Sequence, residues 1–176
     1  MPSDSFSPFP SPPDTPVSTV SPASPQALIR LAGTADSETL CAWLQSRQPL
    51  PVAATRARQA LVEGLLARPE RGACVLAEAA AGLVGCLPVA LVPHLGLAGL
   101  AALATEWWDD GTPSQDAAVL LACCDLLADW CRAHGVRHLL LAPGLLAASQ
   151  AAAAGFLPQA GGLWHRNLSP APKTLG

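Results

Sequence analysis

The residues that most often bind metals or form covalent bonds are six Cys and four His, and their spacing matches neither kind of site. No Cys-x-x-Cys pair occurs, and no His lies at zinc-finger spacing from a Cys. Four of the Cys lie among apolar residues, where a reduced thiol acts as a small hydrophobic group. His134 and His138 are four residues apart, but Gly135 between them is expected to end the helix. Asp109-Asp110-Gly111 is better explained as a turn than as a metal loop. We therefore expect no metal site and no disulfide among positions 41, 74, 86, 123, 124 and 131.

The longest uncharged stretch of the chain runs from Glu78 to Glu106. It is long enough to cross a bilayer as a helix. Pro88, Pro93 and His94 interrupt it, together with several Gly, and Ala is commoner in it than Leu, Ile or Phe. Central strands of a sheet also read as continuous apolar runs, so buried strands explain the stretch better than a membrane span.

Strand patterns divide this stretch. Cys74–Glu78 and Leu83–Leu91 predict a hairpin around the turn at 79–82, and a further strand is expected from about Leu100 to Trp108. Glu106 then lies near the end of a buried strand, beside two Trp. Trp107 and Trp108 are neighbours on that strand, so one ring should face the core and the other a cleft.

Helical patterns flank these strands. After a short strand at 27–31, one helix places Leu40, Trp43 and Leu44 on one face, and a second runs from about 55 to 67. A long helix is expected from Thr112 to His134. Thr112-Pro113-Ser114-Gln115 is a capping box with Pro at the first helical position, which favours this early start.

The order of the C-terminal elements resembles that of the GNAT acyltransferases. The long helix ends at Gly135, a strand follows in Val136–Ala142, an Ala-rich helix comes next, and Gly155-Phe156 leads to a last strand at 163–168. Ala81-Gly82-Leu83-Val84-Gly85 also resembles a turn of that family. The resemblance covers about 27–168 and implies a mixed α/β sheet of six or seven strands with helices on both faces.

The resemblance implies acetyl-coenzyme A as the co-substrate. In the family, an Arg/Gln-x-x-Gly-x-Gly/Ala loop opens the long helix and offers backbone N–H groups to the pyrophosphate. The residues that match this loop are Gln115, Asp116, Ala117, Ala118, Val119 and Leu120. Together with Trp107 and Trp108, they are the expected cofactor contacts. Gln115 fits the pattern, whereas Ala118 and Leu120 replace its small positions and Asp116 adds a negative charge. The cofactor loop is therefore eroded.

The resemblance also implies a catalytic base and a catalytic acid. The family commonly places a Glu on its fourth strand, and Glu106 takes that position as the base that accepts the amine proton. The alternative is a solvent-exposed or structurally hydrogen-bonded carboxylate. The family acid is often a Tyr, but the matching residue is Ala151 and the chain contains no Tyr.

These observations predict one domain at 26–169, a disordered Pro/Ser-rich tail at 1–25 and a flexible segment at 170–176. A net charge of -3 without a basic cluster argues against nucleic acid as a partner. We expect a cytoplasmic N-acetyltransferase acting on a small-molecule or protein amine. A homodimer stays an open alternative for its assembly. The alternative function is a catalytically inactive copy of the fold that serves as a binding or regulatory module.

Overall fold

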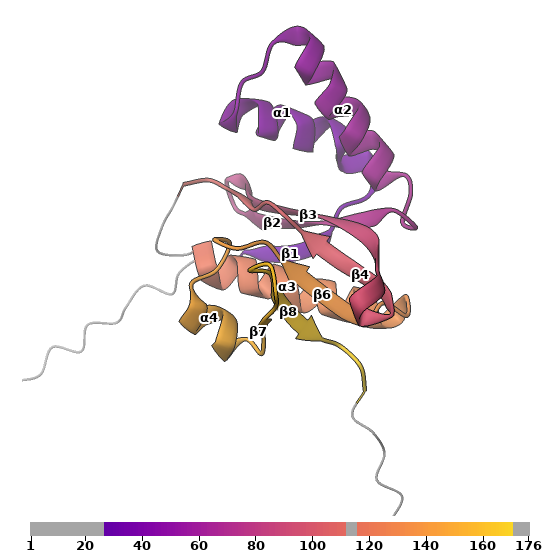
Figure 1. The fold of residues 1–176 in the computed structure, drawn as a ribbon. Helices are drawn as coiled ribbons and strands as arrows, with labels where there is room; N and C mark the ends of the chain where they lie inside the picture. Colours follow the sequence, from indigo (N-terminus) through magenta and orange to yellow (C-terminus); the bar gives the residue numbers. More distant parts are fainter. Residues whose placement is uncertain (1–26, 112–115, 171–176) are drawn as a thin grey trace, which may run out of the picture.

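The computed structural model describes residues 27–111 and 116–170. Its centre is one eight-stranded sheet in the order β1-β2-β3-β4-β6-β8-β7, with β5 pairing with β3 (Figure 1). Among the strand pairs of the described residues, only β4–β6 is parallel. The strands are β1 (Leu28–Leu31), β2 (Gly72–Ala79), β3 (Gly82–His94), β4 (Gly99–Ala104), β5 (Trp108–Asp109), β6 (His138–Leu141), β7 (Leu157–Pro158) and β8 (Trp164–Asn167).

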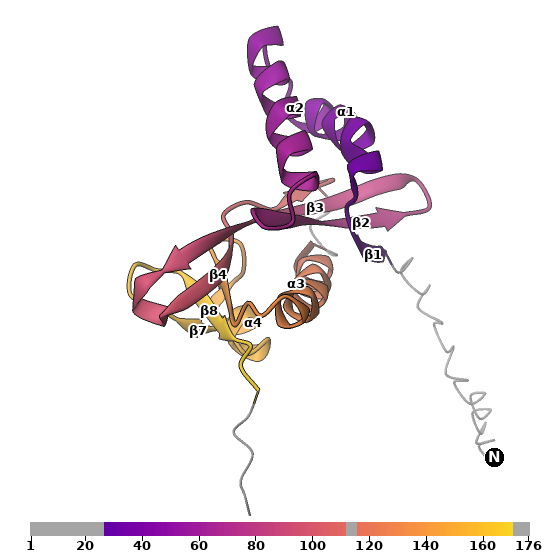
Figure 2. The same ribbon diagram turned by 90° about the vertical axis from the view of Figure 1, so that its right-hand side faces the viewer.

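Helices cover both faces of this sheet (Figures 1 and 2). On one face, a 3-10 turn (Thr34–Asp36) leads into α1 (Ser37–Arg47), and α2 (Val52–Leu66) follows. On the other face lie α3 (Asp116–Ala133) and α4 (Ala148–Ala153). The predicted mixed α/β architecture is confirmed. The sheet has more strands than the six or seven expected because β5 and β7 are two-residue strands without a clear sequence pattern.

The main core lies between α3 and the sheet. One face of α3 is apolar at helical spacing, and its residues Leu120, Cys123, Leu127 and Cys131 are buried against the sheet. Burial raises the pKa of the Cys123 and Cys131 thiols to about 12, so they stay protonated and pack as hydrophobic groups. The helix ends where predicted, because Gly135 adopts the left-handed conformation that closes many helices.

A smaller core lies between the other face of the sheet and α1. Leu40 and Leu44 of α1 pack there against Cys74, Leu76 and Cys86 of β2 and β3. By contrast, α2 has no fully buried side chain. Helix α2 therefore stands above the sheet with its apolar stripe only partly covered.

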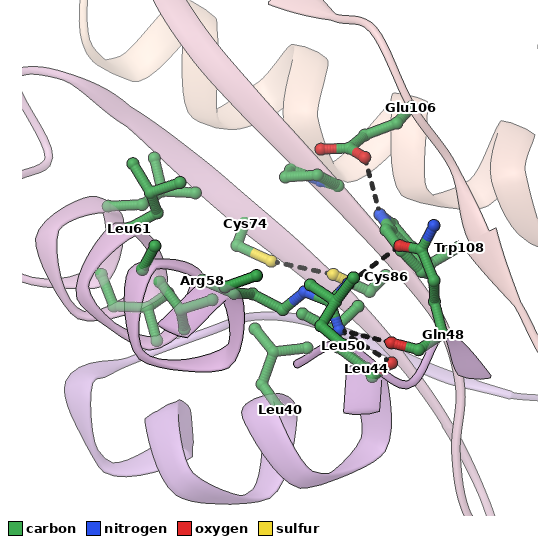
Figure 3. A pocket seen from close by; sticks show the side chains of 16 residues that line it. Leu40, Leu44, Gln48, Leu50, Arg58, Leu61, Cys74, Cys86, Glu106 and Trp108 are labelled. Carbon is green, nitrogen blue, oxygen red and sulfur yellow. Dashed lines mark hydrogen bonds between the residues drawn. The ribbon is translucent and has the colours of Figure 1, made fainter. Parts of the chain in front are cut away.

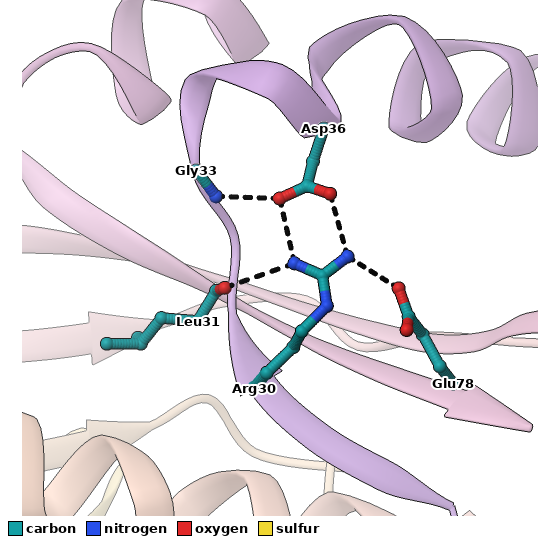
Figure 4. Close-up of polar contacts among 5 residues, drawn as sticks. All are labelled: Arg30, Leu31, Gly33, Asp36 and Glu78. Atoms are coloured by element: carbon teal, nitrogen blue, oxygen red, sulfur yellow. Dashed lines mark hydrogen bonds and ion pairs between the residues drawn. The ribbon is translucent and has the colours of Figure 1, made fainter.

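An ion-pair cluster fixes the chain where β1 leads into α1 (Figure 4). The Arg30 guanidinium donates to both carboxylate oxygens of Asp36, at 2.7 and 2.8 Å, and to Glu78 on β2 at 2.5 Å. Asp36 also accepts a hydrogen bond from the Gly33 backbone N–H at 2.7 Å. These contacts tie the first strand, the 3-10 turn and β2 to one another.

The predicted strand from Leu100 to Trp108 is interrupted. β4 pairs with β6 up to Ala104, whose carbonyl accepts a hydrogen bond from the Ala142 N–H at 2.8 Å. β4 also pairs with β3, and that pairing lapses after Leu103 and resumes at Trp108, which pairs with Cys86 to form β5. The two parallel strands therefore separate at the segment that carries Glu106.

Several predicted boundaries also shift. Helix α2 begins at Val52 rather than at residue 55, directly after Pro51. The described part of the long helix begins at Asp116, and the capping box at 112–115 lies outside the described residues. The tail expected at 1–25 and residues 171–176 of the segment expected at 170–176 also lie outside them. No helix in the described part of the chain is long and apolar enough to cross a membrane.

Candidate functional site

A pocket of about 430 Å³ lies between the α1–α2 pair and the sheet (Figure 3). Leu, Val and Ala side chains of the two helices form its walls, and Cys74, Cys86 and Pro88 of β2 and β3 form its floor. The pocket exists because α2 rests on the sheet through half-buried side chains, so its apolar face does not fill the space beneath it. Its size falls within the range of small-molecule sites.

The polar side chains that line this pocket are Gln48, Arg58, Glu106 and Trp108. The Trp108 indole N–H donates to Glu106 Oε2 at 3.0 Å. Arg58 lies over the same ring, with its Cζ 5.5 Å from the ring centroid. Trp108 therefore stands between a carboxylate and a guanidinium, both of which reach the pocket (Figure 3).

Arg58 is held by contacts with the end of α1. Its guanidinium donates to the Leu44 carbonyl at 3.2 Å, to the Gln48 carbonyl at 2.9 Å and to Gln48 Oε1 at 2.8 Å. The C-terminal carbonyls of a helix carry partial negative charge, which favours a cation there. All three partners are neutral groups. Within residues 27–111 and 116–170, no carboxylate lies at ion-pair distance from Arg58.

The two neighbouring Trp face opposite sides of the sheet, in agreement with strand alternation. Trp107 packs with the main core on the α3 side, whereas Trp108 packs with the smaller core and the pocket. Gly85 allows this arrangement, because a Cβ at that position would lie 2.2 Å from the Trp107 ring. Glu106 is exposed at the junction, two residues from Trp108 and on the same side.

Two thiols meet on the pocket floor. The Sγ atoms of Cys74 and Cys86 are 3.3 Å apart on adjacent antiparallel strands. The contact with Cys74 and burial both raise the pKa of Cys86 well above its ordinary value. A protonated thiol is a poor nucleophile, so Cys86 contributes an apolar surface to the pocket.

The remaining predicted cofactor contacts lie at or beside the start of α3. Gln115 lies outside the described residues, and Asp116 is the first described residue of the helix. Ala117 and Val119 are half-buried, Ala118 is exposed, and Leu120 is 1% exposed within the main core. The first backbone N–H groups of an α-helix lack partners inside it and carry partial positive charge. The first turn of α3 therefore suits an anion, whereas Leu120 is a core residue.

The His and Asp residues with metal-like spacing are not gathered into a site. His134 stacks on Trp130, whereas His138 contacts His165 at 3.1 Å. Asp109 accepts a hydrogen bond from the Gly111 N–H at 2.6 Å, as in a turn. In the described ranges, no three His, Cys, Asp or Glu side chains are placed to hold a metal ion.

Glu106 and Trp108, both singled out from the sequence, line this pocket, whereas Arg58, Gln48 and the two thiols were not predicted as part of a site. These additional residues come from α2, the end of α1, β2 and β3, far from Glu106 along the chain. One feature of the sequence could have indicated Arg58: it lies next to the apolar stripe of α2.

Comparison with solved structures identifies the architecture. An integron cassette protein from the mobile metagenome of Cole Harbour Salt Marsh superposes with a TM-score of 0.61 at 19% identity, over 84% of this chain and 90% of that one. A GNAT family N-acetyltransferase from Escherichia coli, solved in complex with CoA, gives 0.57 at 15% identity over 85% of each chain. The ribosomal-protein-S5-alanine acetyltransferase from Vibrio fischeri gives 0.60 at 13% identity, over 84% and 96%.

The chain has the GNAT fold. No protein-family model and no curated protein matches its sequence. Within this GNAT fold, the parallel strands that separate are β4 and β6, and the pocket opens on the α1–α2 side of the segment that leaves β4.

Proposed function

We propose that this protein transfers an acetyl group from acetyl-coenzyme A to an amine held in the α1–α2 pocket. The observation that carries the proposal is the position of Glu106. It lies where β4 leaves β6, and it lines a pocket that is otherwise mostly apolar. The solved neighbours of the same fold include one in complex with CoA, which supports the choice of acyl donor.

The donor would lie along the separated strands. Its pyrophosphate would lie at the first turn of α3, held by the backbone N–H groups of Asp116, Ala117 and Ala118. Its thioester would lie beside Thr105–Trp107, where β4 no longer pairs with β6. In this arrangement the affinity for the donor would depend on the backbone groups of the helix start rather than on a basic side chain.

Glu106 would act on the acceptor. An ammonium group must lose a proton before its nitrogen can attack a carbonyl carbon, and the exposed carboxylate of Glu106 would accept that proton. The nitrogen then forms the new C–N bond as the C–S bond breaks. The second nitrogen proton passes to the departing thiolate, which completes the balance without a Tyr acid.

The test replaces Glu106 by Gln, which keeps the hydrogen-bond acceptor for Trp108 and removes the base. We expect turnover with acetyl-coenzyme A and a panel of amines, followed by free-thiol release, to fall by roughly 100-fold or more with an unchanged melting temperature. Glu70→Gln is the matched control, since Glu70 is exposed and does not line the pocket. Equal turnover of Glu106→Gln and wild type would contradict the role of the base.

A second candidate function is a binding module without catalysis. It is favoured by Ala151, which is fully buried on α4 where the family acid is often a Tyr. Such a module would bind a ligand in the α1–α2 pocket but release no thiol from acetyl-coenzyme A. Free-thiol release separates the two functions, and thermal unfolding adds a binding test, because acetyl-coenzyme A at 100 times its Kd should stabilise the enzyme by roughly 2.7 kcal/mol. Stabilisation without thiol release would favour the module.

A further inference from the structure

We propose that the acceptor is an α-amino acid with an apolar side chain, bound with its carboxylate on Arg58, its amine toward Glu106 and its side chain in the pocket. This inference rests on the proposed function, which it deepens by naming the class of acceptor. Three features of the pocket carry it: a cation without an acidic partner, a carboxylate across the same Trp ring, and a mostly apolar interior.

Arg58 is the first feature. The described Arg residues that form ion pairs are Arg30, Arg132 and Arg166, whereas Arg58 bonds only to carbonyl and amide oxygens. Its side chain is half-buried and lines the pocket. A guanidinium has five N–H donors in a planar fork that matches a carboxylate. Arg58 therefore has both the charge and the remaining donors to bind an acid.

The second feature is the arrangement around Trp108. Glu106 accepts from the edge of the indole ring, and Arg58 lies over its face. Opposite charges on two sides of one ring fit a zwitterion whose amine and carboxylate diverge from one carbon. The ring itself offers an apolar surface for that carbon, and among the described residues no ion pair joins Arg58 to Glu106.

The interior of the pocket is the third feature. Leu61, Val62, Leu65 and Leu66 of α2 face a cavity of about 430 Å³, and α2 has no fully buried side chain. An apolar side chain of the ligand would bury this surface, with roughly 25 cal/mol gained per Å² removed from water. A polar or charged side chain would lose its hydration there without a partner.

The same features disfavour other amines. A polyamine would place a second positive charge near Arg58. A simple alkylamine would leave the guanidinium without an anion. A peptide N-terminus has an amide where the carboxylate should be. The pocket thus distinguishes acceptors by the group attached to the amine-bearing carbon.

Binding is measured first without acyl donor, so that the result does not depend on catalysis. We expect calorimetry on the full chain to show that phenylalanine binds at least tenfold more tightly than phenethylamine, which lacks only the carboxylate. Phenylalanine should also bind more tightly than alanine, serine or glutamate. Equal binding of phenylalanine and phenethylamine by the wild-type protein would overturn the proposal without any variant.

Variants then assign the carboxylate contact. Arg58→Gln should bring the affinity for phenylalanine down to that for phenethylamine, whereas Arg56→Gln, on the same helix but outside the pocket lining, should not. Arg58→Gln also removes the contacts that join α2 to the end of α1, so Arg58→Lys serves as a second variant. It keeps the positive charge and should keep part of the preference for phenylalanine over phenethylamine. An unchanged preference in both Arg58 variants would overturn the assignment.

A steric pair tests the place of the side chain. Ala57 lines the pocket and Ala60 does not, although both are exposed positions of α2. Ala57→Phe should weaken phenylalanine binding at least tenfold, and Ala60→Phe should leave it unchanged. An equal effect of the two substitutions would overturn the placement. If phenylalanine binds as described but no amine releases thiol from acetyl-coenzyme A, the proposed transferase activity fails while the amino-acid site stands.

Discussion

Replacing Leu120 by Ala tests whether α3 has already entered the core at that residue. Leu120 is 1% exposed and packs in the main cluster. Leu→Ala substitutions in well-packed cores lower the free energy of unfolding by about 3–5 kcal/mol, because the apolar contacts are lost and a cavity remains. A domain of this size has roughly 5–15 kcal/mol in total, so the substitution should remove a large share of its stability.

The assay is urea unfolding followed by the fluorescence of the five Trp. In thermal unfolding followed by the same fluorescence, the melting temperature should fall by about 10 °C, at roughly 2–4 °C per kcal/mol. Leu120→Gly would add about 1 kcal/mol for the loss of helix propensity. Leu61→Ala on α2 is the matched control, because Leu61 is 74% exposed and its truncation should change stability by less than about 0.5 kcal/mol.

The competing interpretation places Leu120 in the phosphate loop. It would be supported if Leu120→Ala cost less than about 1 kcal/mol and tightened coenzyme A binding. Ala118→Gly provides the second arm of the test, since Ala118 is exposed in the first turn of α3. That change should cost at most about 1 kcal/mol, so any effect on coenzyme A affinity can be measured on a folded protein.

Three further predictions concern the frame around the site. Arg30→Met should lower the free energy of unfolding by about 1–2 kcal/mol in the same urea titration, because two carboxylates lose their shared partner. Arg132→Met is the control: it breaks a more exposed ion pair and should cost less than about 0.5 kcal/mol. The hydrogen bond from Arg30 lowers the pKa of Asp36 below its unfolded value. The stability that the ionised Asp36 carboxylate contributes is therefore present at neutral pH and lost as the pH falls below about 4. The gap in melting temperature between wild type and Asp36→Asn should close at that low pH. Gly85→Ala should cost about 1–3 kcal/mol, since the new Cβ would lie 2.2 Å from the Trp107 ring; unchanged unfolding would show that the ring moves freely.

Much of the fold could be predicted because its signals are local. The apolar stripe of α3 and the Gly that ends this helix lie in one continuous stretch of the sequence. The hairpin of β2 and β3 likewise follows from two apolar segments around a Gly turn at Gly82. Each of these elements needs only its own periodicity and its own turn residue.

The interruption of the predicted fourth strand could not be read in the same way. Residues 100–108 are mostly apolar on both sides of the break, so they would suit one continuous strand. What divides them is the loss of one partner, because β4 pairs with both β3 and β6, whereas β5 pairs with β3. The loss of a hydrogen-bonding partner is a tertiary event without a periodic signature.

The pocket shows the same limit in the helix that covers it. The stripe of Ala57, Leu61 and Leu65 predicts a helix face that packs on a core, and a face that lines a ligand site has the same spacing. The difference lies in side-chain size: Ala54 and Ala57 stand where larger residues would close the gap between α2 and the sheet. Since Arg58 follows Ala57 directly, the small residues that leave the cavity open and the cation at its polar end belong to one turn of α2. A substitution at Ala54 or Ala57 changes the volume of the site and one at Arg58 changes its charge, so the two properties are tested with separate variants.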